Sequence, residues 1–515
     1  MRDRFSSRYG GLKRDGNHQR SRNIFSFAAL KFGRQRTRRI PGSEMRNYSP
    51  SLLFVVFLFS AAVLLWIFDN FSGSAELSRS RTLGSIFRIT NNYNVSDTCR
   101  SRIEYASYSR QRSTSFKPSE SLHRKILEYE ALHARCYPGP EQCSNCTCNY
   151  LLYVTAGQGM GNKMIALVAT FLYGLLTDRT MVIAGLENLA TLFCEPFPFS
   201  SWLVPPSWKH LEGAPFDGSK WIGSLVGSLN CSHGVNFPEV VVAYLVSNYR
   251  DEDKAFFCKE HQQALQSSSK WIVLSSDQYF APALYNVPVF RSKLEEWFPQ
   301  EEAIFHLLVR YLLHPRDVVW DRTARYYDAY LAQAELLVGV QLRTSSWFAP
   351  SDLANDAFDC LVQQGALANI TQARAPRSSP RKSKKVAVLV LSLDAQYSQT
   401  LKNKVLGYDL EDGSSVSIHQ PSVEGVQNTG NLDHDAKAVM EIYLLSMSDV
   451  LVTSPPSTFG YSAVGLAGVR PVQFACSGAG CSVRESMEPC YHTYPDQQFM
   501  LDNIQRCECE LGYRL

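Results

Sequence analysis

Apolar residues follow two spacings along most of this chain, and the two spacings alternate. In the first half, short apolar runs predict strands at 149–155, 180–184 and 271–274. Longer runs with helical spacing predict helices at 164–176, 303–313 and 322–335. The second half repeats this order, with strands at 337–342, 386–391, 450–453 and 471–474, a helix at 436–447 and another after Phe459. Strands alternating with helices favour parallel sheets with helices on both faces. The pattern predicts an α/β protein of two Rossmann-like lobes with a cleft between them.

One apolar run fits neither spacing. Leu52–Phe68 holds seventeen residues without a charge, near the short end for a membrane-spanning helix. The first 46 residues carry thirteen Lys or Arg against three acids, so the positive-inside rule puts the N-terminus in the cytosol. A buried core helix is the alternative. A basic tail alone would also suit nucleic-acid binding, but here the tail lies across the predicted span from the folded part, which argues against it.

Cysteine placement agrees with a lumenal location for the rest of the chain. All fourteen cysteines follow the predicted span, and disulfides form in oxidising compartments such as the secretory lumen. The three close cysteines Cys143, Cys146 and Cys148 also suit zinc. No second pair has finger-like spacing, however, and Asn145 begins a glycosylation sequon between them, so we favour disulfides. Further sequons begin at Asn94, Asn230 and Asn369.

Five parts follow from these patterns. Residues 1–51 form a basic cytosolic tail, which we expect to be disordered, and residues 52–68 a transmembrane signal anchor. Residues 69–116 suit a lumenal stem, because they are rich in Ser, Arg and Asn with little periodicity. Two lobes follow, at 117–336 and 337–515, the second with a cysteine-containing tail.

A glycine-rich turn, Gly157–Lys163, follows the first predicted strand. Small residues let backbone N–H groups approach an anionic ligand at a helix N-terminus. The spacing matches neither a dinucleotide fingerprint, since Asn162 takes the place of the third glycine, nor a phosphate-binding P-loop. A tight strand–helix connection is the alternative.

Two further strand ends carry polar groups. Gln341 and Arg343 end the strand at 337–342, where ligands of open α/β sheets bind. Arg343 suits a diphosphate because a guanidinium forms paired hydrogen bonds and stays charged, although a surface ion pair is the alternative. The turn Ser457–Gly460 follows the strand at 450–453, and its hydroxyls suit either helix capping or phosphate binding.

Acidic residues offer two kinds of chemistry. Asp277 directly follows the strand at 271–274 and suits an acceptor contact or a base, with a turn cap as the alternative. Asp251–Asp253 and Asp433–Asp435 have the D-x-D form that some sugar transferases use for a metal. Neither follows a predicted strand end as expected, so solvated acidic turns are the favoured interpretation.

Several long segments resemble the plant xyloglucan and arabinogalactan fucosyltransferases. The similarity runs from about Glu128 to the C-terminus, and its most specific pieces occur in order along the chain: Tyr129–Cys136, Leu192–Pro198, Arg325–Leu331, Val338–Arg343, Glu441–Asp449, Ser457–Tyr461 and Ser486–Cys490. The resemblance implies a GT-B-like fold, GDP-fucose as donor, and inversion at the sugar without a metal or other cofactor. The N-terminal lobe then serves the acceptor and the C-terminal lobe the donor.

The resemblance also implies roles for single residues. Arg343 would neutralise the donor diphosphate and Asp277 would lie near the acceptor, and these two are the expected catalytic residues. The donor pocket would further be lined by three segments and their neighbours: Gly159, Gly161, Asn162, Lys163, Gln341, Ser392, Asp394, Ser457, Thr458, Phe459 and Gly460. Some positions depart from the family, since Lys163 stands where Arg is usual, Leu342 where Val or Ile is usual, and Asp394 where Asn is usual.

The expected activity is transfer of L-fucose to a galactose or arabinose hydroxyl, in an α-1,2 linkage to O2, of a plant cell-wall glycan. The alternative is a non-catalytic lumenal protein that binds or scaffolds glycans, which would need no diphosphate site. Expected partners are GDP-fucose, a cell-wall polysaccharide or glycoprotein glycan, the Golgi membrane through one helix and, as a candidate, a second copy of the chain. No nucleic acid is expected.

Overall fold

The structure, a computed structural model, describes residues 99–110, 116–137, 147–155, 157–184, 187–205, 220–222, 225, 236–246, 251–300, 303–344, 352–371, 384–455, 457–475 and 480–489. The predicted cytosolic tail and the Leu52–Phe68 anchor lie outside these residues. Among the described helices, Met160–Thr177 alone is long and apolar enough to cross a membrane, and 89% of it is buried inside the protein, as in a core helix.

The first half of the described chain forms a parallel sheet. Its described strands follow the order β2-β1-β5-β4-β3, and every neighbouring pair is parallel. Their bounds are Tyr150–Thr155 for β1, Thr180–Ala184 for β2, Lys220–Trp221 for β3, Val240–Leu245 for β4 and Trp271–Ser276 for β5. The strand predictions at 149–155, 180–184 and 271–274 are therefore confirmed.

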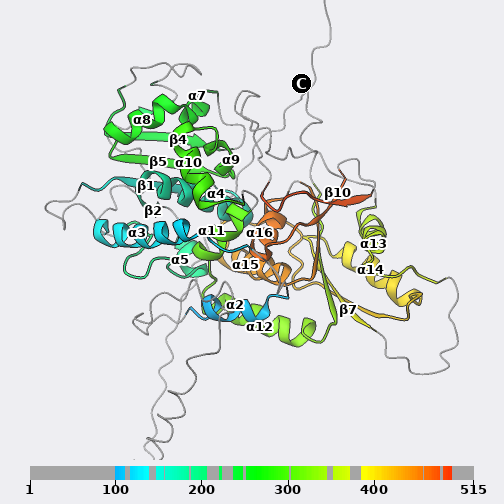
Figure 1. The fold of residues 1–515 in the computed structure, drawn as a ribbon. Coiled ribbons are helices and arrows are strands. Elements are labelled where there is room, and N and C mark those ends of the chain that lie inside the picture. The colour runs from blue at the N-terminus through cyan, green and yellow to red at the C-terminus, as the bar shows by residue number, and fades with distance from the viewer. Residues whose placement is uncertain are drawn as a thin grey trace, which may run out of the picture. The chain divides into compact units, whose positions relative to one another are not determined.

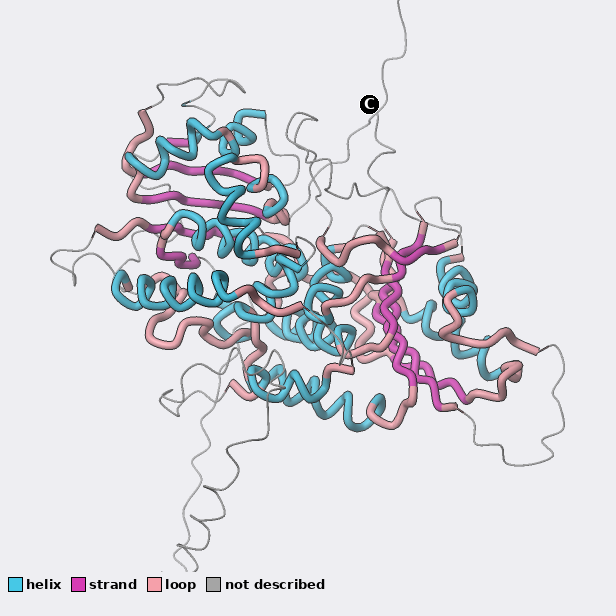
Figure 2. Tube along the Cα trace, in the orientation of Figure 1, coloured by secondary structure: helices cyan, strands magenta, loops and turns pink. Residues whose placement is uncertain are grey.

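The second half forms another sheet, with the described strands in the order β11-β10-β9-β6-β7-β8. Only the pair of β10 and β11 is antiparallel among these strands. The bounds are Leu336–Gln341 for β6, Lys385–Leu391 for β7, Ser415–His419 for β8, Val450–Thr453 for β9, Val472–Phe474 for β10 and Cys481–Val483 for β11. Two mainly parallel sheets with helices confirm the α/β prediction (Figures 1 and 2).

Helices cover these sheets. Those of the first half are α3 (Glu120–Cys136), α4 (Met160–Thr177), α5 (Glu187–Leu192), α7 (Asp251–Lys254), α8 (Lys259–Ser268), α9 (Ala281–Leu284), α10 (Pro288–Trp297) and α11 (Ile304–Leu312). Those that follow are α12 (Asp317–Tyr326), α13 (Leu353–Gln363), α14 (Ala395–Gly407), α15 (Leu432–Ser446) and α16 (Thr458–Ala467). The helix predicted at 322–335 is partly wrong, because α12 widens into a π-helical turn at Tyr327–Leu331, where the Ala332 N–H donates to the Tyr327 carbonyl.

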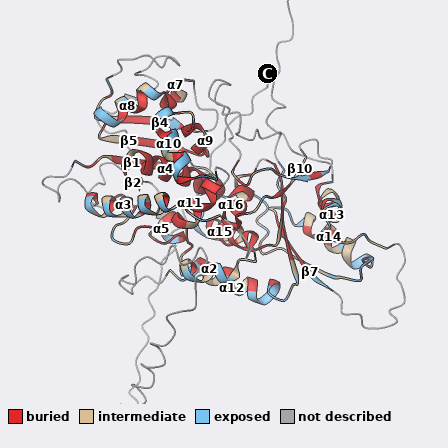
Figure 3. Ribbon diagram, in the orientation of Figure 1, coloured by how far each residue is buried: buried red, intermediate tan, exposed pale blue. Residues whose placement is uncertain are grey.

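Successive side chains of strand β7 face two different hydrophobic cores. Ala387, Leu389 and Leu391 join the large core that also contains α4, α15 and α16. Val386, Val388 and Val390 face the opposite way, into a smaller core with α13. A strand buried on both faces is expected of a parallel sheet. Figure 3 shows α4 and α16 coloured as buried along their length.

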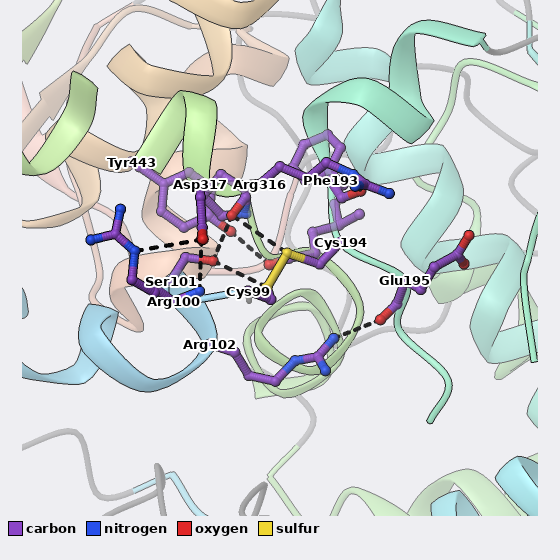
Figure 4. Close-up of a disulfide and its surroundings, with 12 residues drawn as sticks. Cys99, Arg100, Ser101, Arg102, Phe193, Cys194, Glu195, Arg316, Asp317 and Tyr443 are labelled. Carbon is purple, nitrogen blue, oxygen red and sulfur yellow. Dashed lines mark hydrogen bonds and ion pairs between the residues drawn. A yellow bond between two sulfur atoms is a disulfide. The ribbon is translucent and has the colours of Figure 1, made fainter. Parts of the chain in front are cut away.

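Residues 99–108 correct the stem prediction. Helix α2 (Ser101–Tyr108) falls inside the segment assigned to a stem, yet Tyr105 is 3% exposed and packs edge-on against Trp320 and Tyr443. A disulfide joins Cys99 to Cys194, and Figure 4 shows Arg100, Ser101 and Arg102 around it. The folded part of the chain therefore begins at or before Cys99, because aromatic burial and a disulfide outweigh the polar composition of this segment.

The described disulfides bear on the zinc alternative. Cys148 pairs with Cys136, and a further disulfide joins Cys360 to Cys481. Cys143 and Cys146 lie outside the described residues. Since the sulfur of Cys148 is bonded to another sulfur, it is not a zinc ligand here, and the disulfide interpretation is confirmed for this cysteine.

Candidate active site

The predicted functional residues follow the carboxyl ends of parallel strands. In the first lobe, the glycine-rich turn follows β1 and Asp277 follows β5. In the second lobe, Arg343 follows β6, Ser392 follows β7 and the Ser457–Gly460 turn follows β9. This is the edge of an open α/β sheet where ligands bind. Direct contacts join several of these segments across the two lobes.

Asp277 holds the glycine-rich turn against β5. The Gln158 amide donates to one carboxylate oxygen at 3.1 Å, and the Gln278 amide donates to the other at 2.8 Å. The Asn162 side-chain amide donates to the Asp277 backbone carbonyl at 3.1 Å. Asp277 is 1% exposed. Its carboxylate is thus a buried acceptor that orders the turn.

The turn also contacts the second lobe. The Thr458 hydroxyl donates to the Asn162 side-chain oxygen at 2.8 Å, although the residues are 296 positions apart. A β-carbon at Gly161 would lie 2.6 Å from the Phe459 backbone nitrogen and 2.8 Å from the Thr458 hydroxyl. Gly161 therefore permits the close approach of α4 to α16. Close packing of the two helices therefore explains why glycine stands at position 161 without requiring a bound phosphate.

Arg343 reaches toward the same turn. Its backbone N–H donates to the Ser454 hydroxyl at 3.0 Å, and its guanidinium donates to the Gln427 side-chain oxygen at 3.1 Å. The Gln427 amide nitrogen in turn lies 2.5 Å from where a β-carbon of Gly159 would stand. Among the residues that the structure describes, no carboxylate pairs with Arg343, so the surface ion-pair alternative is not observed there.

Other predicted donor-site residues have structural partners. Gln341 is 4% exposed, and its side-chain oxygen accepts the Ser454 N–H at 3.2 Å. The Ser392 hydroxyl accepts the Asp394 N–H at 3.1 Å, and Asp394 caps α14 through the Gln396 N–H at 2.8 Å. Ser457 occupies the N-cap position of α16 without a side-chain capping bond. Gly460 packs against Gln341 and Thr453, since a β-carbon there would lie 3.1 and 3.2 Å from them.

Lys163 forms an ion pair with a residue of the second lobe. Its ammonium lies 3.4 Å from Asp435, and the two side chains are 6% and 2% exposed. This buried ion pair joins α4 to α15 and thereby the first lobe to the second. Lys163 lies within the turn's helix, as the sequence indicated, but the partner that the structure gives it is a carboxylate.

Both D-x-D segments lie in helices, which corrects their interpretation as solvated turns. Asp435 is 1% exposed against Lys163, whereas Asp433 is exposed and pairs with Arg322 and Lys437. Asp253, at the end of the other segment, is 2% exposed and accepts the Tyr244 N–H at 3.2 Å. A helix turns successive side chains in different directions, which separates the carboxylates of Asp433 and Asp435. Within the described residues, no group of three or more His, Cys, Asp or Glu is arranged to hold a metal ion.

Sequence reasoning missed Gln158, Gln278 and Gln427. Gln158 lies inside the glycine-rich turn and Gln278 is the neighbour of Asp277, so their positions beside predicted residues were an available signal. Gln427 belongs to a polar connection between β8 and α15 with no motif of its own. Only the fold brings it to Arg343, which lies 84 positions earlier.

Two α/β lobes, with the glycine-rich turn of one meeting the strand-end Arg343 of the other, have the arrangement of a GT-B-like fold. Comparison with known proteins makes this specific. The sequence profile described as xyloglucan fucosyltransferase matches residues 70–499. The chain belongs to the xyloglucan fucosyltransferase family and is a GDP-fucose-dependent fucosyltransferase.

Individual relatives agree with the family. The galactoside 2-alpha-L-fucosyltransferase of Pisum sativum is 33% identical over 474 residues, which cover 85% of this chain and 82% of that protein. Fucosyltransferase 6 of Arabidopsis thaliana is 34% identical, with 84% of each protein covered. A solved structure of a FUT1 mutant from Arabidopsis thaliana, in complex with GDP, superposes with a TM-score of 0.69 at 32% identity and covers 81% of this chain and 93% of that one.

Proposed function

We propose that this enzyme transfers L-fucose from GDP-fucose to O2 of a galactose or arabinose in a plant cell-wall glycan, xyloglucan or an arabinogalactan protein. The observation that carries the proposal is the meeting of Arg343, the glycine-rich turn and the Asp277 loop at the carboxyl ends of two parallel sheets. Similarity to two proteins named galactoside 2-alpha-L-fucosyltransferases supports the galactose acceptor and the linkage.

Arg343 has the chemistry that the donor requires. A diphosphate is charged in the ground state and gains charge as the glycosidic bond breaks, so a guanidinium beside it stabilises the transition state more than the substrate. In our proposal, the turns that contain Gly159 and Thr458 contribute N–H and hydroxyl donors, with Gln341, Ser392 and Asp394 at the adjoining strand ends.

Asp277 belongs to the first lobe, which we assign to the acceptor. It lies on the first lobe beside the turn, and amide groups hold both of its carboxylate oxygens. An oxocarbenium-like transition state needs only a weak base or a well-positioned hydroxyl. We therefore propose that Asp277 orders the acceptor surface through Gln158.

We also propose that transfer inverts the sugar without a metal. Activity that is retained in EDTA supports metal independence, whereas activity that is lost in EDTA and restored by manganese contradicts it.

We further propose that the enzyme is a type II protein of the Golgi membrane, anchored by Leu52–Phe68 with its folded part in the lumen. The charge asymmetry around this span supports the orientation. Protease added to sealed Golgi vesicles is expected to remove only the N-terminal tail, whereas digestion of the region from Cys99 onward contradicts the proposal.

Substitution of Arg343 tests the donor site. Arg343→Ala is expected to lower turnover of GDP-fucose by about 100- to 1000-fold, the usual loss when one such electrostatic donor is removed. Arg343→Lys is expected to be severely impaired as well, because an ammonium lacks the planar fork. Turnover and thermal midpoint are measured together in the full chain.

The exposed Arg322, which pairs with Asp433, offers a matched control. Arg322→Ala is expected to keep both turnover and midpoint. If Arg343→Ala retained parental turnover, the donor-site assignment would be wrong, and if its turnover fell only with its midpoint, Arg343 would be a structural residue.

A further inference from the structure

A short arm of the second lobe lies between two glycines in the left-handed backbone conformation. Gly425 has φ +71° and Gly430 has φ +87°, and a β-carbon at either position would meet nothing within 4 Å. Residues 426–429 between them form what we call the Gln427 arm. The left-handed conformation suits glycine and strains other residues, so these two positions determine where the arm begins and ends.

Both ends of the arm are tied to the second lobe. The Gly425 N–H donates to the Leu393 carbonyl at 2.9 Å. Asn431 caps α15, where its side-chain oxygen accepts the N–H groups of Asp433 and His434 at 3.0 and 3.1 Å. The arm is thus held at its base beside the strand ends of the donor lobe.

Gln427 extends from this arm to both sides of the candidate site. Its side-chain oxygen accepts from Arg343 Nη2 at 3.1 Å, and its amide nitrogen lies 2.5 Å from the β-carbon position of Gly159. Among the described residues, the Gln427 amide donates to the Thr429 hydroxyl, at a long 3.4 Å. Gln427 therefore stands between the guanidinium and the glycine-rich turn, the two features from which the donor site was inferred.

We propose that Gln427 is a positioning residue that competes with the donor diphosphate for the guanidinium of Arg343. The inference rests on the proposed function, because it takes Arg343 as the diphosphate-binding residue. A neutral amide oxygen and a charged phosphate oxygen are alternative acceptors for the same Nη2 donor, and the charge-assisted bond is the stronger one. Gln427 occupies the guanidinium in the absence of the donor, and the donor must displace its amide to bind, which lowers donor affinity.

The sign of the Gln427→Ala effect tests this competition. GDP binding to the full chain in detergent is measured by calorimetry, together with the KM values for GDP-fucose and for the acceptor. Gln427→Ala is expected to bind GDP about two- to fivefold more tightly, the size of one solvent-exposed hydrogen bond, and to lower the KM for GDP-fucose equally while leaving the KM for the acceptor unchanged. Gln427→Glu is expected to bind GDP at least about tenfold more weakly, because its carboxylate pairs with Arg343.

Gln399, an exposed glutamine on α14 that donates to Asn403, is the matched control, and Gln399→Ala is expected to change neither value. Unchanged or weaker GDP binding in Gln427→Ala overturns the proposal, since a residue that contacted the diphosphate favourably would weaken binding when removed.

A double-mutant cycle separates this inference from the proposed function. In an Arg343→Ala background, Gln427→Ala is expected to leave GDP affinity unchanged, because the competition acts through Arg343. The same tightening in both backgrounds overturns it. If Arg343→Ala alone leaves GDP affinity unchanged, the donor-site assignment itself is wrong. If Arg343→Ala weakens GDP binding while Gln427→Ala has no effect on it, only the inference about Gln427 is wrong.

Discussion

Glycine at position 161 is needed because two helices meet at its α-carbon. The backbone of Thr458 and Phe459 lies 2.6 Å from the position of a β-carbon, closer than real β-carbons approach. The neighbouring Gly157 is in open space, since nothing lies within 4 Å of its β-carbon position. Two glycines of one turn thus differ in what they tolerate, and the difference comes from the second lobe.

Replacing these two glycines one at a time tests whether the second lobe restricts position 161 but not position 157. Gly161→Ala is expected to lower the free energy of unfolding by about 1–3 kcal/mol, as overpacking does, and to lower activity by displacing the Ser457–Gly460 turn. Gly157→Ala is expected to change both little. Thermal melts and turnover of the two variants are compared with those of the parent; equal tolerance at both positions would contradict the α4–α16 contact.

At the level of elements, a buried ion pair joins α4 to α15. Lys163 and Asp435 are almost fully buried, and burial of an unpaired charge is costly. Lys163→Met is therefore expected to destabilise the protein by about 3–5 kcal/mol, and adding Asp435→Leu to recover most of that loss. Chemical denaturation measures both variants.

The partly exposed Lys437, which pairs with Glu424 and Asp433, is the control, and Lys437→Met is expected to cost less than about 1 kcal/mol. If Lys163→Met lost GDP affinity at unchanged stability, Lys163 would instead contact the donor, as the sequence predicted.

Another element-scale feature is the acid Glu441 on α15. Burial raises the pKa of Glu441 to about 7, although the Ser422 hydroxyl donates to it at 2.7 Å and lowers the pKa in part. Because the folded state then holds a proton that the unfolded state has lost, this carboxyl lowers stability as the pH rises from about 4.5 to about 7.

Glu441→Gln is expected to remove this dependence. The difference in unfolding free energy between Glu441→Gln and the parent is expected to grow in favour of the variant between pH 5 and pH 8, and to reach about 1–3 kcal/mol. Denaturant melts of both proteins at the two pH values give the comparison. A difference that stays constant over this range would mean that the pKa of Glu441 is not raised.

At the scale of the whole molecule, α2 joins parts of the described chain that are distant in sequence. Cys99 is bonded to Cys194 (Figure 4), the Ser101 hydroxyl donates to the Pro315 carbonyl at 2.7 Å, and the Tyr105 hydroxyl lies 2.7 Å from that of Ser446. Farther on, Arg110 pairs with Asp449 at 2.8 Å. The segment therefore contacts both lobes.

A folding test follows from this arrangement. A fragment that begins at residue 90 is expected to fold, whereas one that begins at residue 117, where the sequence placed the first lobe, is expected to melt several degrees lower or to aggregate. The reason is that loss of Tyr105 uncovers Trp320 and Tyr443 and removes a disulfide, which typically contributes about 2–4 kcal/mol. Melting temperature and soluble yield give the comparison, and equal values would show that α2 is dispensable.

Local patterns predicted most of the strands and the edge where the site lies. Strand β9 begins and ends where its apolar run does, and so does β2, because buried parallel strands need continuous apolar residues. The predictions failed at α2, at the helix after residue 322 and at the two D-x-D segments. At α2, contacts with residues distant in sequence outweigh the local composition, since Tyr105 packs against Trp320 and Tyr443. The π-helical turn has a distant aromatic partner as well, since the ring of Tyr327 lies 5.3 Å from that of Tyr108.

By itself, the sequence determined the two α/β lobes, the family and the strand ends that carry Asp277 and Arg343, since these depend on residue order over short stretches. The tertiary structure alone decided which strand-end groups meet. Asn162 contacts Thr458 across 296 positions, Lys163 contacts Asp435 across 272, and Gln427 reaches Arg343 from a connection without a motif. Such pairs depend on how α4 packs against α15 and α16, and the shape of that packing is a property of many side chains together that no local spacing records.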